Sequence, residues 1–145
     1  MQNLSTQAEA VIYYIQEMDI EMIDLILDKD KTYQEFPKRE FIEKLGDAFD
    51  IMKLLHNEKL IGYPGFCGSD DCPNQCKNGY SFIGNTSNHK IDLLFEVKNG
   101  EIQDLFECSV FEILSKEKNT DFLRRVFIDR SNDPLMNDDG TWDPF

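Results

Sequence analysis

The chain has 145 residues, which is enough for one domain with a single hydrophobic core. Hydrophobic residues make up 41% of it and include 11 phenylalanines, a composition that excludes a disordered protein. Its 28 acidic and 15 basic residues give a formal net charge of −13. That charge disfavours nucleic acid and anionic membrane surfaces as partners, because like charges repel.

No run of residues approaches the roughly 20 apolar positions that cross a bilayer. Residues Met1 to Ser5 also lack the basic start and apolar centre of a signal peptide. We therefore expect a cytoplasmic protein. Thiols stay reduced in that compartment, so the four cysteines are expected to be metal ligands or plain thiols before disulfides.

Three helices are predicted in the first part of the chain. Thr6 and Glu9 have the spacing of a capping box, Asp19 is expected to cap a second short helix, and Pro37 is expected to start a third. The third helix is the longest and ends near His56. Apolar residues recur at helical spacing in all three, which indicates faces that pack into the core: Ala8, Val11, Ile12, Ile15, Met18, Ile20, Ile23, Ile26, Leu27, Phe41, Ile42, Leu45, Ala48, Phe49, Met52 and Leu55.

The pattern then changes. Residues 62–79 are rich in cysteine, glycine and proline and predict an irregular loop. Strands are predicted at Tyr80–Ile83, His89–Val97 and Ile102–Phe111, and Asn99 with Gly100 predicts a tight hairpin turn between the last two.

A turn at Lys98 to Glu101 pairs Val97 with Ile102 and Leu93 with Phe106. In this register one face of the hairpin is apolar, with Asp104 as its only carboxylate, and the other face is polar. Such alternation predicts a sheet covered on one side. The expected inward face comprises Ile91, Leu93, Phe95, Val97, Ile102, Phe106, Cys108 and Val110.

The expected organisation is a single α+β domain over residues 1–130. Residues 131–145 form an acidic C-terminal extension.

Helical stripes from Ala8 to Leu55, followed by strands at Tyr80–Asn85 and Ile91–Ile102, resemble the cone-shaped α+β fold of the nuclear transport factor 2 superfamily. The resemblance implies N-terminal helices packed on a curved antiparallel sheet. It also implies a homodimer through the open sheet face, or a small-molecule ligand in the cone. That superfamily contains isomerase-like and dehydratase-like enzymes as well as non-catalytic binding domains, so fold does not select function. The cysteine-rich insertion departs from its common pattern.

Cys67, Cys72 and Cys76 carry the strongest chemical signal, with a C-x4-C-x3-C spacing. Three thiols within ten residues of a Gly- and Pro-rich loop can converge on one zinc ion, which prefers four tetrahedral sulfur or nitrogen ligands. The alternatives are unliganded thiols, or a redox or disulfide loop. Asp70 and Asp71 are further candidates to complete a metal site, although we expect them to be solvated loop charges.

A structural zinc site needs a fourth ligand. Cys108 is preferred because four-thiolate sites are a common structural type, and His89 is the alternative. Without a metal, Cys108 is expected to be a small core residue and His89 an ordinary residue at the start of a strand.

The predicted function is that of a domain with structural zinc that binds a ligand or supports protein assembly. The alternative is a small cone-fold enzyme in which Asp104 acts as general base, helped by Tyr13, Tyr14 or His56. Against that alternative, Asp104 lies near the Asn99–Gly100 turn, where a carboxylate can simply reach solvent.

Overall fold

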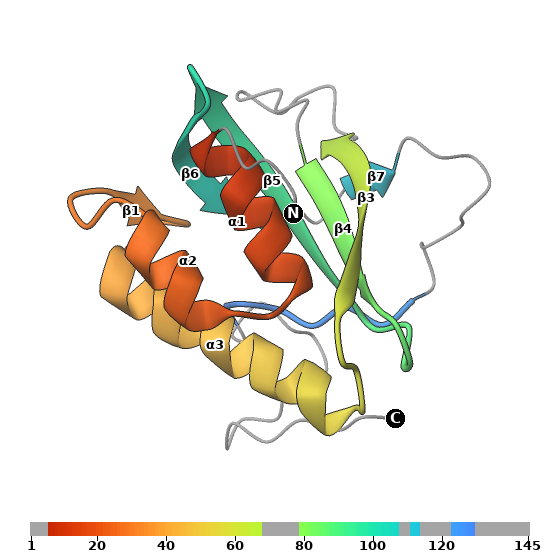
Figure 1. Ribbon diagram of the computed structural model, residues 1–145. Coiled ribbons are helices and arrows are strands. Elements are labelled where there is room, and N and C mark those ends of the chain that lie inside the picture. Colours follow the sequence, from red (N-terminus) through yellow and green to blue (C-terminus); the bar gives the residue numbers. More distant parts are fainter. Residues whose placement is uncertain (1–5, 68–78, 108–110, 114–122, 130–145) are drawn as a thin grey trace.

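The computed structural model describes residues 6–67, 79–107, 111–113 and 123–129. Within them the chain forms an α+β fold, as predicted (Figure 1). The predicted extension at residues 131–145 lies outside the described residues. In chain order the elements are α1 (Gln7–Gln16), α2 (Ile20–Ile26), β1 (Thr32–Tyr33), β2 (Phe36–Pro37), α3 (Lys38–Leu54), β3 (Leu60–Cys67), β4 (Gly79–Gly84), β5 (Lys90–Lys98), β6 (Glu101–Phe106) and β7 (Phe111–Ile113).

The helices begin where the capping residues predicted. Thr6 Oγ1 accepts from the Glu9 N–H at 3.1 Å and Asp19 Oδ1 accepts from the Met22 N–H at 3.2 Å, so each side chain satisfies a donor that the first helical turn leaves unpaired. Pro37 precedes α3, where its missing N–H costs no hydrogen bond.

β3 corrects the prediction of an irregular loop over residues 62–79. It pairs with β4 from Leu60↔Gly84 to Gly65↔Gly79, so regular structure continues through Cys67. The Gly62 N–H donates to Gln16 Oε1 at 2.9 Å and thus points away from β4. The nitrogen of Pro64, two residues later in β3, lies on the same side of the strand as that of Gly62. The lack of an N–H at Pro64 therefore removes no hydrogen bond between β3 and β4.

The five-stranded antiparallel sheet has the order β6-β5-β4-β3-β7. The single strand predicted for Ile102–Phe111 is therefore wrong. Its first part is β6 at one edge, and Phe111 belongs to β7, which pairs with β3 at the other edge.

The β5–β6 hairpin follows the predicted register only near its turn. Asn99 and Gly100 both have positive φ, at 54° and 80°, and Val97 pairs with Ile102 as predicted. A bulge then shifts the register by one residue, so that Leu94, not Leu93, pairs with Phe106. Leu105 thereby takes the core position opposite Phe95, and the predicted core positions of Asp104 and Phe106 are wrong.

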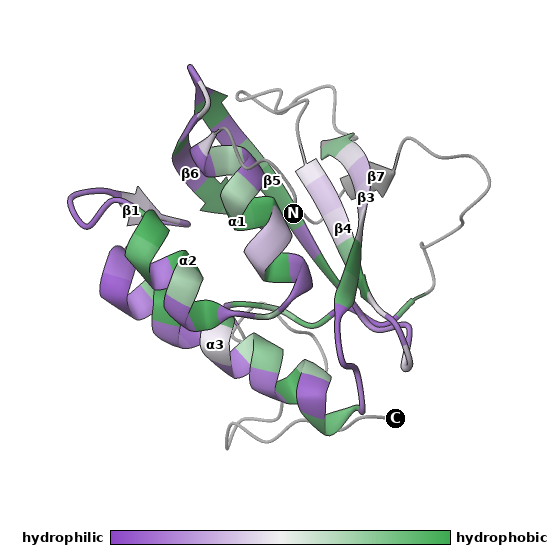
Figure 2. Ribbon diagram, in the orientation of Figure 1, coloured by the Kyte–Doolittle hydropathy of each residue, from purple (hydrophilic) through white to green (hydrophobic). Residues whose placement is uncertain are grey.

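The core lies between the helices and one face of the sheet (Figure 1). Hydrophobic and hydrophilic residues alternate along all three helices, as Figure 2 shows. The largest fully buried side chains come from both layers: Tyr33, Phe41, Phe49, Phe82, Ile15, Ile23, Leu45, Met52, Leu60, Ile91, Leu93 and Leu94. Each such side chain stabilises the fold by about 1.5–3 kcal/mol through removal of apolar surface from water.

The second face of the sheet is also buried at β4 and β5, which corrects the prediction of a sheet covered on one side. Ser81, Asp92 and Leu94 lie on that face and are 0%, 2% and 0% exposed. The expected open face for a homodimer is therefore not open at the centre of the sheet. No helix among the described residues has the length and apolar character needed to cross a membrane.

Candidate functional site

Cys67 is the only cysteine within the described residues, and it is the last residue of β3. Cys72, Cys76 and Cys108 lie outside them. No group of three or more His, Cys, Asp or Glu that could hold a metal ion occurs within residues 6–67, 79–107, 111–113 and 123–129.

The described strands nevertheless fix where the chain leaves and re-enters the sheet beside the cysteines. Cys67 pairs with Phe111, and Gly65 pairs with Gly79. Cys108 is three residues before Phe111, and Cys76 is three residues before Gly79. Three residues of backbone span at most about 11 Å. Cys67 therefore lies at one end of the sheet, which we call the cysteine end, and Cys76 and Cys108 each come three residues before a strand that begins there.

His89 is anchored at the opposite end. It directly precedes β5, and its carbonyl accepts from the Gly84 N–H at 2.8 Å. Gly84 and Gly79 are five residues apart along β4, or about 16 Å. Sequence alternation could not reveal this separation, because it gives the face of a strand and not the end at which a side chain lies.

The His89 ring belongs to a hydrogen-bonded cluster with Ser87 and Asn57. Ser87 Oγ accepts a hydrogen bond from Asn57 Nδ2 at 2.8 Å and lies 2.8 Å from His89 Nδ1. The Ser87 hydroxyl can therefore donate a hydrogen bond to the imidazole. Burial lowers the pKa of His89 below its ordinary value, Arg124 lowers it further by repulsion, and the Ser87 hydrogen bond opposes both. A neutral imidazole is favoured at this position.

Asp104 lies opposite Glu96 and not over the core. Its Oδ1 accepts from the backbone N–H of Gln34 at 2.9 Å and of Leu105 at 2.8 Å. Burial raises the pKa of Asp104, the two hydrogen bonds lower it, and repulsion from Glu96 and Glu35 raises it again. Asp104 thus holds the β1–β2 turn against β6.

By the predicted alternation Glu107 belongs to the polar face of the hairpin, but its side chain is only 4% exposed. It accepts from Gln34 Nε2 at 3.0 Å and from the backbone N–H groups of Ile128 and Asp129 at 2.8 and 3.0 Å. Burial raises the pKa of Glu107 despite these hydrogen bonds. It holds residues 123–129 beside β6, and the sequence carries no signal for this role, because its partners are distant in the sequence.

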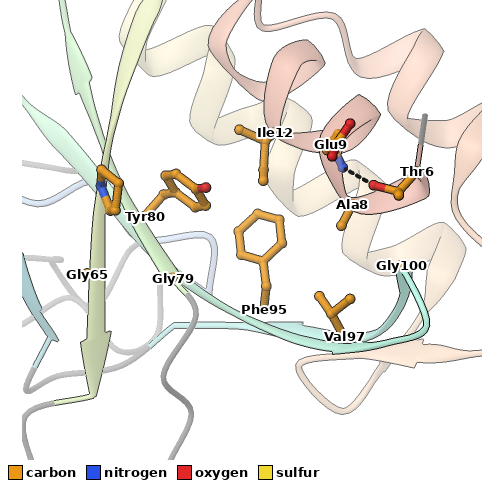
Figure 3. A pocket seen from close by; sticks show the side chains of 11 residues that line it. Thr6, Ala8, Glu9, Ile12, Gly65, Gly79, Tyr80, Phe95, Val97 and Gly100 are labelled. Carbon is orange, nitrogen blue, oxygen red and sulfur yellow. Dashed lines mark hydrogen bonds between the residues drawn. The ribbon is translucent and has the colours of Figure 1, made fainter. Parts of the chain in front are cut away.

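A cavity of about 300 Å³ lies between α1 and the sheet (Figure 3). α1 contributes Ala8 and Ile12, and the sheet contributes Pro64, Tyr80, Phe95 and Val97. Its floor includes Gly65 and Gly79, the paired residues next to the cysteine end. Asp104 does not line it.

Comparison with protein-family models, with curated proteins and with solved structures finds no match to this chain.

Proposed function

We propose that Cys67, Cys72, Cys76 and Cys108 bind one zinc ion, and that this ion is a structural staple between the ends of β3, β4 and β7. One observation carries the proposal. The pairs Gly65↔Gly79 and Cys67↔Phe111 bring the starts of β4 and β7, each three residues after a cysteine in the sequence, to the end of the sheet where β3 ends at Cys67.

A zinc ion at this end would stabilise an edge of the sheet that is only briefly paired. Within the described part of the chain, β7 is held to β3 by three residue pairs, Gly65↔Ile113, Phe66↔Glu112 and Cys67↔Phe111. Short edge strands add few contacts of their own, so a metal that crosslinks the flanking segments stabilises the edge. Four thiolates fill the tetrahedral shell and leave no open position for water, which supports a structural ion and not a catalytic one.

Cys108 is supported over His89 as the fourth ligand. His89 is about 16 Å along the sheet from the cysteine end, and its Nδ1 lies 2.8 Å from Ser87 Oγ. A ligand at that distance requires the loop to cross the length of the sheet.

The proposed role is that of a cytoplasmic ligand-binding or assembly domain with the cone-like architecture of the nuclear transport factor 2 relatives. Three helices that precede an antiparallel sheet and cover one of its faces support this architecture. The enzyme alternative gains no such support, because Asp104 is held in backbone hydrogen bonds outside the cavity.

Elemental analysis of protein purified without added metal tests the staple. We expect about one zinc per chain, because thiolates bind zinc tightly enough to survive purification. Cys72→Ser and Cys108→Ser should each lower the zinc content well below one equivalent. His89→Asn is the control and should retain the metal.

Two outcomes contradict the proposal. A zinc content below one equivalent that is the same in Cys72→Ser would refute the proposed site. Full zinc in Cys108→Ser together with loss in His89→Asn would overturn the choice of fourth ligand.

A further inference from the structure

We infer that the cavity between α1 and the sheet is a binding site for a small, flat, uncharged aromatic molecule that carries one hydrogen-bonding group. The inference rests on the ligand-binding role proposed above and names its ligand class, and it is independent of the zinc staple because the residues that line the cavity do not include the proposed zinc ligands.

The cavity is open because small residues face each other across it. Pro64 and Gly65 on β3 and Gly79 on β4 carry no side chain long enough to reach α1, and α1 presents Ala8 on its side. Its volume of about 300 Å³ lies at the lower end of small-molecule sites. A helix about 10 Å across does not fit such a space, whereas two fused aromatic rings do.

Two aromatic rings define the shape of the ligand. Tyr80 and Phe95 lie with their ring centroids 5.8 Å apart and their planes at 74°, so one offers an edge where the other offers a face. Ile12 and Val97 add aliphatic walls. A flat ring can make a face contact with one aromatic residue and an edge contact with the other, which is the arrangement that aromatic groups prefer.

The Tyr80 hydroxyl supplies the polar contact. Figure 3 shows it pointing into the space bounded by Ile12 and Phe95. Among the described residues no group hydrogen-bonds to it. The hydroxyl of this half-buried tyrosine can donate to an oxygen or nitrogen of the ligand.

Charge selects against anions. The whole chain carries a net charge of −13. An anionic aromatic molecule is therefore repelled as it approaches the chain. An uncharged ligand does not meet this repulsion.

The test uses the full chain as purified, with 2-naphthol as probe and naphthalene as its hydroxyl-free match. Amide NMR titration should show shifts at Gly65, Gly79 and Gly100, with a dissociation constant for 2-naphthol below about 1 mM. Tyr80→Phe should weaken 2-naphthol about three- to tenfold, since one hydrogen bond is lost, and leave naphthalene unchanged.

Ile12→Trp fills the cavity and should abolish binding of both probes. Leu25→Trp is the matched control, because Leu25 is 77% exposed on α2 and lies away from the cavity, and it should bind as the unmodified chain does. Thermal unfolding of each variant shows whether it is folded. Should Ile12→Trp fail to fold, the Tyr80→Phe comparison still decides the matter.

Absence of shifts at the three glycines would overturn the inference, and so would equal binding by folded Ile12→Trp. Equal weakening of both probes by Tyr80→Phe would overturn the assignment of its hydroxyl. Binding only after removal of residues 1–5 would assign the cavity to the chain's own N-terminal segment and overturn the site.

Discussion

The buried ion pair between Lys90 and Asp92 is the most consequential feature at the scale of single residues. Lys90 Nζ lies 3.2 Å from Asp92 Oδ2, and the side chains are only 9% and 3% exposed. Among the described residues, Asp92 Oδ1 and the Ser81 hydroxyl beside it have no hydrogen-bond partner. Removal of one charge from such a pair leaves the other buried and uncompensated, which costs far more than the intact pair contributes.

Lys90→Met should therefore lower the free energy of unfolding by about 3–5 kcal/mol, measured by urea denaturation. The double change Lys90→Met with Asp92→Leu should recover most of this loss, because neither charge of the pair remains. Glu43→Gln is the control. It breaks a pair with Arg39 whose side chains are 69% and 93% exposed, and it should cost less than about 1 kcal/mol. A small loss in Lys90→Met would show that water reaches the pair.

At the scale of elements, Asn57 joins the end of α3 to the turn between β4 and β5. Its Nδ2 donates to the Met52 carbonyl at 3.0 Å and to Ser87 Oγ at 2.8 Å. Its Oδ1 accepts from the N–H groups of Thr86 and Ser87 at 2.8 and 2.9 Å. Gly84 makes room for this amide, because a Cβ atom there would overlap the Asn57 carboxamide.

Asn57→Ala should lower the free energy of unfolding by about 2–4 kcal/mol, since buried donors and acceptors lose their partners. Gly84→Ala should also destabilise, through steric overlap. The double variant should lose at least about 1 kcal/mol less than the sum, because loss of the carboxamide at position 57 leaves space for the methyl group added at position 84. Additive losses in thermal or chemical unfolding would show that the overlap is relieved by a backbone shift.

At the scale of the whole molecule, the two ends of the sheet are held by different means. Asn57, Ser87 and His89 hold one end through hydrogen bonds. Within the described residues, the cysteine end is held by the short pairing of β7 with β3, and there we propose the zinc staple.

Removal of zinc by a chelator should therefore loosen one end and spare the other. Amide hydrogen exchange should speed up about tenfold or more at residues 65–67 and 111–113, while residues 84–90 keep their protection. Readdition of zinc is the control and should restore slow exchange. Uniform acceleration over the whole sheet, or none anywhere, would contradict a local staple.

The sequence by itself determined the features that depend on near neighbours. Thr6, Asp19 and Pro37 mark the starts of the helices through local capping, and Asn99 with Gly100 forms the hairpin turn through its tolerance of positive φ. The cysteine spacing likewise predicts a metal from composition and distance along the chain alone.

Only the tertiary structure decided the rest. The bulge after Glu96 moved Asp104 off the core face, and β7 joined the far edge of the sheet, because both depend on partners distant in sequence. Lys90, Asp92 and Glu107 belong to the polar face by alternation, yet their side chains are buried. The same long-range pairing separates His89 from Cys67, which no periodicity could reveal.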